Sequence, residues 1–361
     1  MKEKEKQLFK ALCKFKDKFT DPSLIEFATP AVLGHLFFNR MQGVAYDVLK
    51  KTGLLGKVNR EFRNSLGAAY DQNVQKNDSF KKCIVMLSEI LSPCTCKVAM
   101  LKGAYLCAHY PNGYRTSNDV DLLVLPKDVT AVGNMLSSAG FKQGNVRNGE
   151  FIPATRQEII ESKMMRGETV PYIKEVNLPF MKFFEVDINF SLDYKNGTED
   201  TLSDMLANVC IKNEKEISVP TLDDADFFIH LCAHLYKEAT TLPWIEMHRD
   251  MTLYKYCDIY MLLSEMTDAA IQRIFARATE LGMEKVCAYT LLEAMGLFDM
   301  DNPFAYSASH VALEDDPDFC LRVVSPKDKK VLKYQTSDVT ERFFMETRAK
   351  DLKEVDENET P

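Results

Sequence analysis

A run of apolar residues that contains one carboxylate constrains this chain more than any other feature of its sequence. Residues 120–125 are apolar apart from Asp121, and Asp119 lies directly before them. Such a run is typical of a β-strand in a sheet that is covered on both faces. Because residues two apart on a strand point to the same face, we expect Asp119 and Asp121 to lie side by side where the strand begins.

Two carboxylates this close together need an explanation. They repel each other, and a buried charge without a partner is costly. A divalent cation between them removes both problems, and Mg²⁺ prefers hard oxygen ligands. The same arrangement is required for phosphoryl or nucleotidyl transfer by two metal ions. Pairs with this spacing also occur at solvated strand ends, so the surrounding sequence must distinguish the two interpretations.

The preceding segment favours a functional interpretation. Residues 97–101 are strand-like and are followed by Lys102 and Gly103. A helix-compatible stretch covers residues 104–110, and a Pro-Asn-Gly turn then leads to Arg115 and the aspartate strand.

A third carboxylate follows on a later predicted strand. Residues 183–190 alternate with a period of two, which places Glu185, Asp187 and Asn189 on one face and apolar side chains on the other. Asp187 is therefore a candidate to join Asp119 and Asp121.

The order of these parts resembles the DNA polymerase β-like nucleotidyltransferase superfamily. The closer resemblance is to an uncharacterised bacterial nucleotidyltransferase family with the pattern KG … R … DIDLLV … L … GF, followed by a VDLHW strand. The matching positions here are Lys102-Gly103, Arg115, residues 119–124, Leu136, Gly140-Phe141 and residues 186–190. Two positions depart from the pattern. Ala104 follows the glycine where the superfamily usually has serine or glycine, and Asn189 replaces a frequent histidine.

The resemblance implies an α+β fold. Its centre is a polymerase β-like nucleotidyltransferase core, a small mixed sheet with helices, flanked by N-terminal and C-terminal helical regions. We expect the N-terminal helical region over residues 1–92, the core over 93–200 and the C-terminal helical domain over 201–300. A polar, partly disordered tail is expected over residues 301–361.

The resemblance also implies a chemistry, the Mg²⁺-dependent transfer of NMP from an NTP to a hydroxyl acceptor. The catalytic and metal-binding residues would be Asp119, Asp121 and Asp187, which would hold two Mg²⁺ ions, with Mn²⁺ as an alternative. The nucleotide-binding residues would be Lys102, Gly103, Arg115 and Ser117. Lys102 could instead pair with Asp121 in a structural role.

The acceptor side is less defined. His230 and His234 lie one helical turn apart, but a zinc site is disfavoured because the first histidine is not followed by glutamate and no third ligand is evident. His234 and Asp258 are candidates for contact with the acceptor, which could be a small molecule, a protein or an RNA end.

The composition of the chain bears on nucleic-acid binding, membrane association and cellular location. The net charge of −8 does not favour bulk DNA binding. No apolar run approaches the ~20 residues that span a bilayer, and the start of the chain does not resemble a signal peptide. The ten cysteines lack C-x-x-C spacing, so we expect reduced thiols and a cytoplasmic location.

Two questions stay open at this point. Residues 142–182 are irregular and basic, and they could form hairpins or a solvated connection. A non-catalytic alternative also remains, in which the fold senses nucleotides or binds a partner, as half of a toxin–antitoxin-like pair or as an accessory of a biosynthetic cluster.

Overall fold

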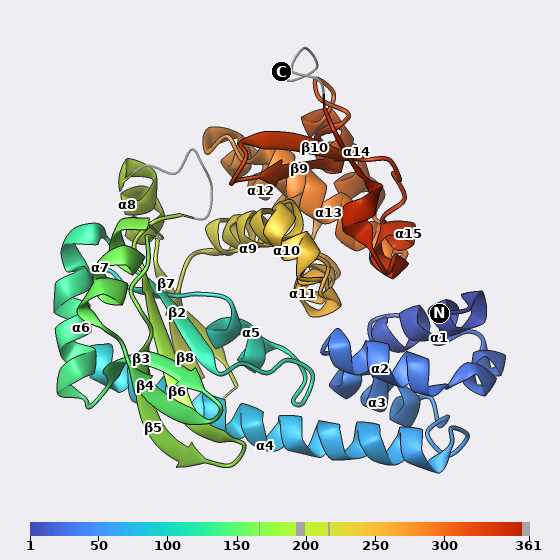
Figure 1. Ribbon diagram of the computed structural model, residues 1–361, viewed down its shortest axis with the longest axis horizontal. Helices are drawn as coiled ribbons and strands as arrows, with labels where there is room; N and C mark the ends of the chain where they lie inside the picture. Colours follow the sequence, from blue (N-terminus) through green and yellow to red (C-terminus); the bar gives the residue numbers. More distant parts are fainter. Residues whose placement is uncertain (166, 193–198, 216, 356–361) are drawn as a thin grey trace. The chain divides into compact units, whose positions relative to one another are not determined.

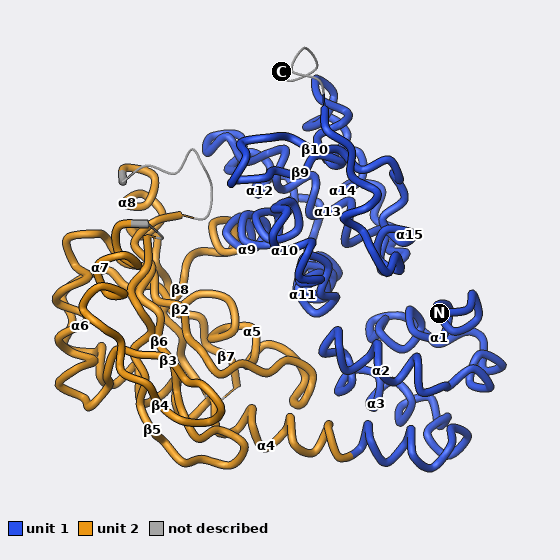
Figure 2. Tube along the Cα trace, in the orientation of Figure 1, with its two compact units in different colours: residues 1–67, 228–361 blue, residues 68–227 orange. Residues whose placement is uncertain are grey.

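Contacts divide the chain into two compact units. The computed structural model describes residues 1–165, 167–192, 199–215 and 217–355. Unit 1 is formed by residues 1–67 and 228–361, and unit 2 by residues 68–227 (Figure 2). Unit 2 is thus inserted into the sequence of unit 1.

Unit 2 contains a mixed sheet in which the described strands follow the order β1-β2-β6-β5-β3-β4 (Figure 1). The strands are β1 (Ala99–Met100), β2 (Asp119–Leu123), β3 (Lys142–Arg147), β4 (Glu150–Pro153), β5 (Tyr172–Leu178) and β6 (Met181–Asn189). Strands β2 and β6 are parallel, and the other neighbouring pairs are antiparallel. A separate ribbon pairs β7 (Cys210–Glu214) with β8 (Ile217–Thr221). The predicted α+β fold with a small mixed sheet is confirmed.

One face of this sheet forms the core of unit 2. Along β6, Phe184, Val186 and Ile188 are fully buried. Phe80 and Phe141 pack edge-on against Phe184, with ring centroids 6.2 and 5.9 Å away. Among the described residues, the helices that lie wholly within this unit are α5 (Gly103–His109), η2 (Pro126–Asp128), α6 (Val129–Ser138), α7 (Arg156–Met165) and α8 (Glu199–Ala207). Because strand side chains alternate, burial of this face leaves the opposite face to the polar residues of β2 and β6.

Two long helices contain the boundaries between the units. The helix α4 (Arg60–Leu91) continues from unit 1 into unit 2, and α9 (Asp224–Ala239) returns the chain to unit 1. At the start of α9, the Asp223 carboxylate accepts from the Asp226 N–H at 2.9 Å and so caps this helix. Within the described residues, no helix combines the length and the apolar character needed to cross a membrane.

Unit 1 is mainly helical. Its N-terminal elements are α1 (Glu3–Cys13), η1 (Pro22–Phe27), α2 (Pro30–Phe38) and α3 (Gln42–Lys51). After α9 it contains α10 (Leu242–Glu246), α11 (Leu253–Leu263), α12 (Asp268–Glu280), α13 (Glu284–Phe298), α14 (Pro303–Ala312), η3 (Phe319–Leu321), α15 (Val339–Phe344) and η4 (Arg348–Asp351). A small antiparallel sheet has the order β11-β10-β9, with β9 (Arg322–Ser325), β10 (Lys330–Tyr334) and β11 (Leu352–Glu354).

The C-terminal segment differs from the expected polar, partly disordered tail. Val323 and Tyr334 pack with Ile245 in one apolar cluster. Two arginines that look solvent-exposed in the sequence are buried. Arg342 pairs with Glu293 at 2.5 Å, and Arg348 pairs with Asp250. These contacts fold the segment through Glu354, while residues 356–361 lie outside the described residues.

Other boundaries also differ from the sequence-based expectations. The residues 93–200 assigned to the core lie inside unit 2, but this unit extends from 68 to 227. The first strand has only two residues, because its pairing with β2 is limited to Ala99↔Leu123 and Met100↔Leu122. Within residues 142–182, β3 and β4 form a hairpin, so the hairpin alternative holds for that part of the segment.

Candidate functional site

The site residues lie on two neighbouring parallel strands of unit 2. In the register of β2 and β6, Asp121 is opposite Asp187 and Asp119 is opposite Glu185. Neighbouring strands in a sheet are about 4.8 Å apart. The three predicted catalytic aspartates are therefore brought together on the polar face, and Glu185 is a fourth acidic residue beside them.

Each aspartate of β2 has polar partners. The Ser117 hydroxyl donates to Asp119 Oδ1 at 2.6 Å. The Asn189 amide donates to Asp121 Oδ1 at 3.2 Å, and the Lys102 ammonium lies 3.3 Å from Asp121 Oδ2. Both oxygens of Asp121 are thus engaged by side chains from two other elements.

Asp187 is electrostatically different from its neighbours. Burial and the nearby negative charges of Asp121, Asp119, Glu168 and Glu185 raise its pKa to about 8. Burial, followed by the charge of Asp119, also raises the pKa of Glu185. Negative charge that is concentrated this strongly favours either a proton or a bound cation.

Three polar residues beside the aspartates had no role in the sequence-based prediction, namely Glu168, Glu185 and Asn189. Glu168 lies beside this group because residue 168 forms an isolated antiparallel bridge with Asn189. Nothing in the sequence around Glu168 signals that contact. Glu185 and Asn189 were placed on the correct face by their alternation. Their positions opposite Asp119 and next to Asp121 required the strand register.

The turn before α5 explains why Gly103 is a glycine. A Cβ atom at this position would lie 3.1 Å from both Cβ and Oγ of Ser117, which is tighter than an ordinary contact. Gly103 therefore lets the turn approach the residue that hydrogen-bonds Asp119. The preceding Lys102 has φ 46° and ψ −113°, a backbone conformation that favours glycine.

The remaining predicted residues belong to other segments of the chain. Arg115 precedes β2 and its guanidinium donates to the Thr116 carbonyl at 2.8 Å. His234 and Asp258 belong to α9 and α11 of unit 1. There, Nε2 of His234 lies 3.6 Å from Glu238, and Asp258 is buried at 5 % exposure.

Carboxylate oxygens are the type of ligand that divalent ions such as Mg²⁺ and Mn²⁺ bind. As the side chains stand, no three His, Cys, Asp or Glu residues in the described part of the chain are arranged to hold a metal ion. Asp119, Asp121 and Asp187 could hold one after side-chain rotation, since the strand register already brings their backbones together.

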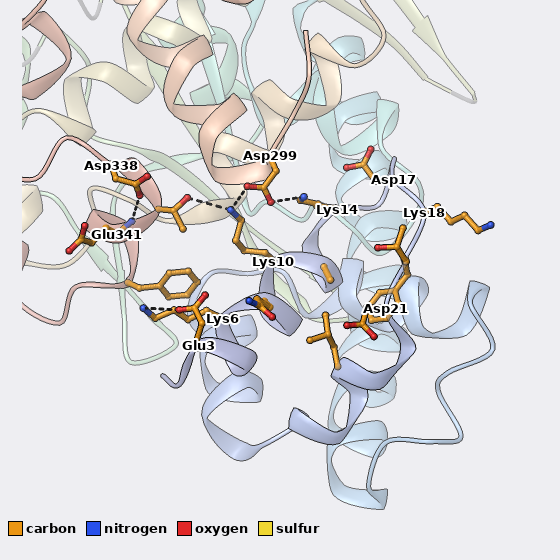
Figure 3. A pocket seen from close by; sticks show the side chains of 17 residues that line it. Glu3, Lys6, Lys10, Lys14, Asp17, Lys18, Asp21, Asp299, Asp338 and Glu341 are labelled. Atoms are coloured by element: carbon orange, nitrogen blue, oxygen red, sulfur yellow. Dashed lines mark hydrogen bonds and ion pairs between the residues drawn. The ribbon is translucent and has the colours of Figure 1, made fainter.

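A separate pocket of about 870 Å³ lies within unit 1 (Figure 3). Lys10 and Lys14 both point to the Asp299 carboxylate, with contacts of 2.6 Å each. This shared ion pair joins the first helix to the end of α13. Since the lysines are already paired, the contact has a structural role, and it does not create a basic pocket.

Comparison with known proteins places most of the chain in one family. The model of a family described as an uncharacterised nucleotidyltransferase matches residues 29–299. This range includes the whole of unit 2 and the carboxylates of β2 and β6. No curated protein gives a significant match.

Proposed function

Because the chain belongs to this uncharacterised nucleotidyltransferase family, we propose that it transfers NMP from an NTP to a hydroxyl acceptor and releases pyrophosphate, in a Mg²⁺-dependent reaction. The observation that carries this proposal is the register of β2 and β6, which sets Asp121 opposite Asp187, with Asp119 on the same strand face. Three carboxylates on adjacent strands supply the ligand type and charge that metal-assisted nucleotidyl transfer needs.

The reaction forms one phosphorus–oxygen bond and breaks another. The acceptor oxygen attacks the α-phosphorus, its proton leaves to solvent, and the bond to the β-phosphate breaks with pyrophosphate as the leaving group. Divalent ions, when bound, neutralise charge on the phosphates and favour the attacking alkoxide. Asp119, Asp121 and Asp187 would hold those ions.

The chain also supplies groups that orient the aspartates. Ser117 fixes one oxygen of Asp119, and Asn189 fixes one oxygen of Asp121. A carboxylate with one oxygen held by a hydrogen bond has fewer orientations to lose when its other oxygen binds a cation. Arg115 is the candidate for a bidentate contact with the phosphates, for which its guanidinium must leave the Thr116 carbonyl.

The acceptor and the base of the nucleotide are tested together by label transfer. Each α-³²P-labelled NTP is incubated with the protein, Mg²⁺ or Mn²⁺, and RNA, protein or small-molecule fractions of a cell lysate. Label on one fraction with the wild type but not with Asp121→Asn identifies the acceptor class. Asp71→Asn, an exposed change on α4, is the matched control and retains transfer.

The same labelled NTPs test the non-catalytic alternative when their binding to the protein is also measured, with and without the metal ion. A protein that binds NTP in a metal-dependent way but labels no fraction is a nucleotide sensor. A protein that neither labels a fraction nor binds NTP contradicts the enzymatic proposal and favours a module that binds a partner protein.

A further inference from the structure

Lys102 and a metal ion compete for the same carboxylate. Nζ of Lys102 lies 3.3 Å from Oδ2 of Asp121, and Asn189 occupies the other oxygen. The Lys102 and Asp121 side chains are only 19 % and 17 % exposed, so solvent screens this pair weakly. Asp121 is therefore already neutralised by a cation from its own chain.

The backbone holds this lysine at an unfavourable conformation. With φ 46° and ψ −113°, Lys102 adopts dihedral angles that glycine adopts without strain. The chain has a glycine at the next position but a lysine at this one. The strained turn fixes the stem of the Lys102 side chain within reach of Asp121 Oδ2.

A divalent ion and the ammonium compete for this oxygen. Mg²⁺ binds carboxylate oxygens at about 2.0–2.1 Å, which would bring it close to an ammonium that is 3.3 Å from the same atom. The two cations repel each other strongly at that separation in a partly buried site. Metal binding at this oxygen therefore favours a position of the Lys102 ammonium farther from Asp121.

We propose that Lys102 is a displaceable cation that links metal binding to nucleotide binding. The metal ion displaces Lys102 from Asp121, and the released ammonium then contacts the phosphates that accompany the metal. This inference rests on the proposed function, because it assumes that Asp121 is a metal ligand. Lys102 then has two roles in turn. It pairs with Asp121 in the metal-free site, and it contacts phosphate once the metal ion and the nucleotide are bound.

The proposal predicts effects of opposite sign for one substitution. Lys102→Met removes a competitor, so the metal alone binds more tightly, by roughly tenfold for the loss of one weakly screened charge. It also removes a phosphate contact, so the complex of metal and polyphosphate binds more weakly, by roughly tenfold or more.

The experiment uses the full chain after removal of divalent ions with EDTA and dialysis. Binding of Mn²⁺ alone is followed by the electron paramagnetic resonance signal of the free ion. Binding of Mn²⁺ with inorganic tripolyphosphate, which carries the phosphates without a base, is followed by calorimetry. Lys182→Met is the matched control, since Lys182 is an ion-paired lysine on β6 whose partner, Glu150, is exposed. Lys102→Gly relieves the backbone and serves if Lys102→Met fails to fold.

A second measurement locates the ammonium directly. In crystals grown with Mn²⁺ and tripolyphosphate, anomalous scattering places the metal, and we expect Nζ of Lys102 to be more than 4 Å from Asp121 and near a phosphate oxygen. Mn²⁺ on Asp121 with Lys102 still paired to the same carboxylate would overturn the inference. Equal Mn²⁺ affinity of the wild type and both Lys102 variants would overturn it as well, while leaving the proposed enzyme intact. A wild type that binds no Mn²⁺ would contradict the metal site and the proposed function together.

Discussion

Asp121 and Asp187 stand directly opposite each other on the parallel strands β2 and β6. The surroundings of the two carboxylates differ. Asp121 has a lysine and an asparagine as partners, whereas burial and neighbouring carboxylates raise the pKa of Asp187 to about 8. The pair therefore combines one carboxylate that is paired with an ammonium and one whose surroundings favour the protonated form.

This difference predicts how stability depends on pH. Between the ordinary value of 3.8 and about 8, the folded protein retains the Asp187 proton that the unfolded chain has released. The free energy of unfolding in EDTA should therefore fall as pH rises through this range, by at most about 1.4 kcal/mol per pH unit. Asp187→Asn should remove the contribution of Asp187 and so make this slope shallower, which urea unfolding at pH 5, 6, 7 and 8 measures. An identical slope in the variant would show that Asp187 is ionised throughout.

The conformation of Lys102 predicts a difference between two substitutions. Both Lys102→Met and Lys102→Gly remove the ion pair with Asp121, but only glycine accepts φ 46° and ψ −113° without strain. Relief of this strain outweighs the extra entropy of glycine in the unfolded chain, so Lys102→Gly should be more stable than Lys102→Met by about 1 kcal/mol. Urea unfolding of both variants at one pH provides the comparison. If the methionine variant is the more stable one, the turn is not strained.

The contact between Gly103 and Ser117 predicts a coupled pair. Gly103→Ala places a Cβ atom 3.1 Å from Ser117 and should destabilise the protein by roughly 1–3 kcal/mol, the usual cost of overpacking. Ser117→Gly removes both contacting atoms. In a double-mutant cycle, the alanine should therefore cost less in the Ser117→Gly background. Additive free energies of unfolding would place the strain of Gly103→Ala elsewhere.

The buried ion pair in unit 1 predicts a large loss of stability. Arg348 donates from Nε and a terminal nitrogen to the two oxygens of Asp250, at 2.7 Å each, and Asp250 is fully buried. Arg348→Met leaves that carboxylate buried without its partner, which typically costs about 3–5 kcal/mol. Chemical unfolding checks this value. The double variant Arg348→Met/Asp250→Leu should recover much of the loss, whereas Lys330→Met, which removes an exposed pair with Glu354, should leave stability nearly unchanged.

Local patterns were sufficient to predict the elements that carry the site. The apolar run after Asp119 and the alternation around Asp187 depend only on neighbouring residues, and both segments form strands that begin or end near the predicted positions. The start of α2 is also a local feature, because the Thr29 hydroxyl accepts from the Val32 N–H and Pro30 follows as the first helical residue.

The partners within the site could not be predicted from local patterns. The pairing of Asn189 with Asp121 joins residues 68 positions apart, and it depends on which strands are neighbours and in which register. The bridge that brings Glu168 to the group has no local signal. The C-terminal segment was misjudged for a related reason, because Arg342 and Arg348 find their buried partners 49 and 98 residues away.

The interrupted sequence of unit 1 has a consequence for synthesis on the ribosome. Lys10 pairs with Asp299, which is synthesised 289 residues later. At about 5–20 residues per second, that delay is roughly 15–60 s. Phe9, which is fully buried and stacks on Phe343 in the finished unit, is without this partner during the interval. The first helices are therefore synthesised long before the residues that cover Phe9, and the whole of the inserted unit is synthesised in between.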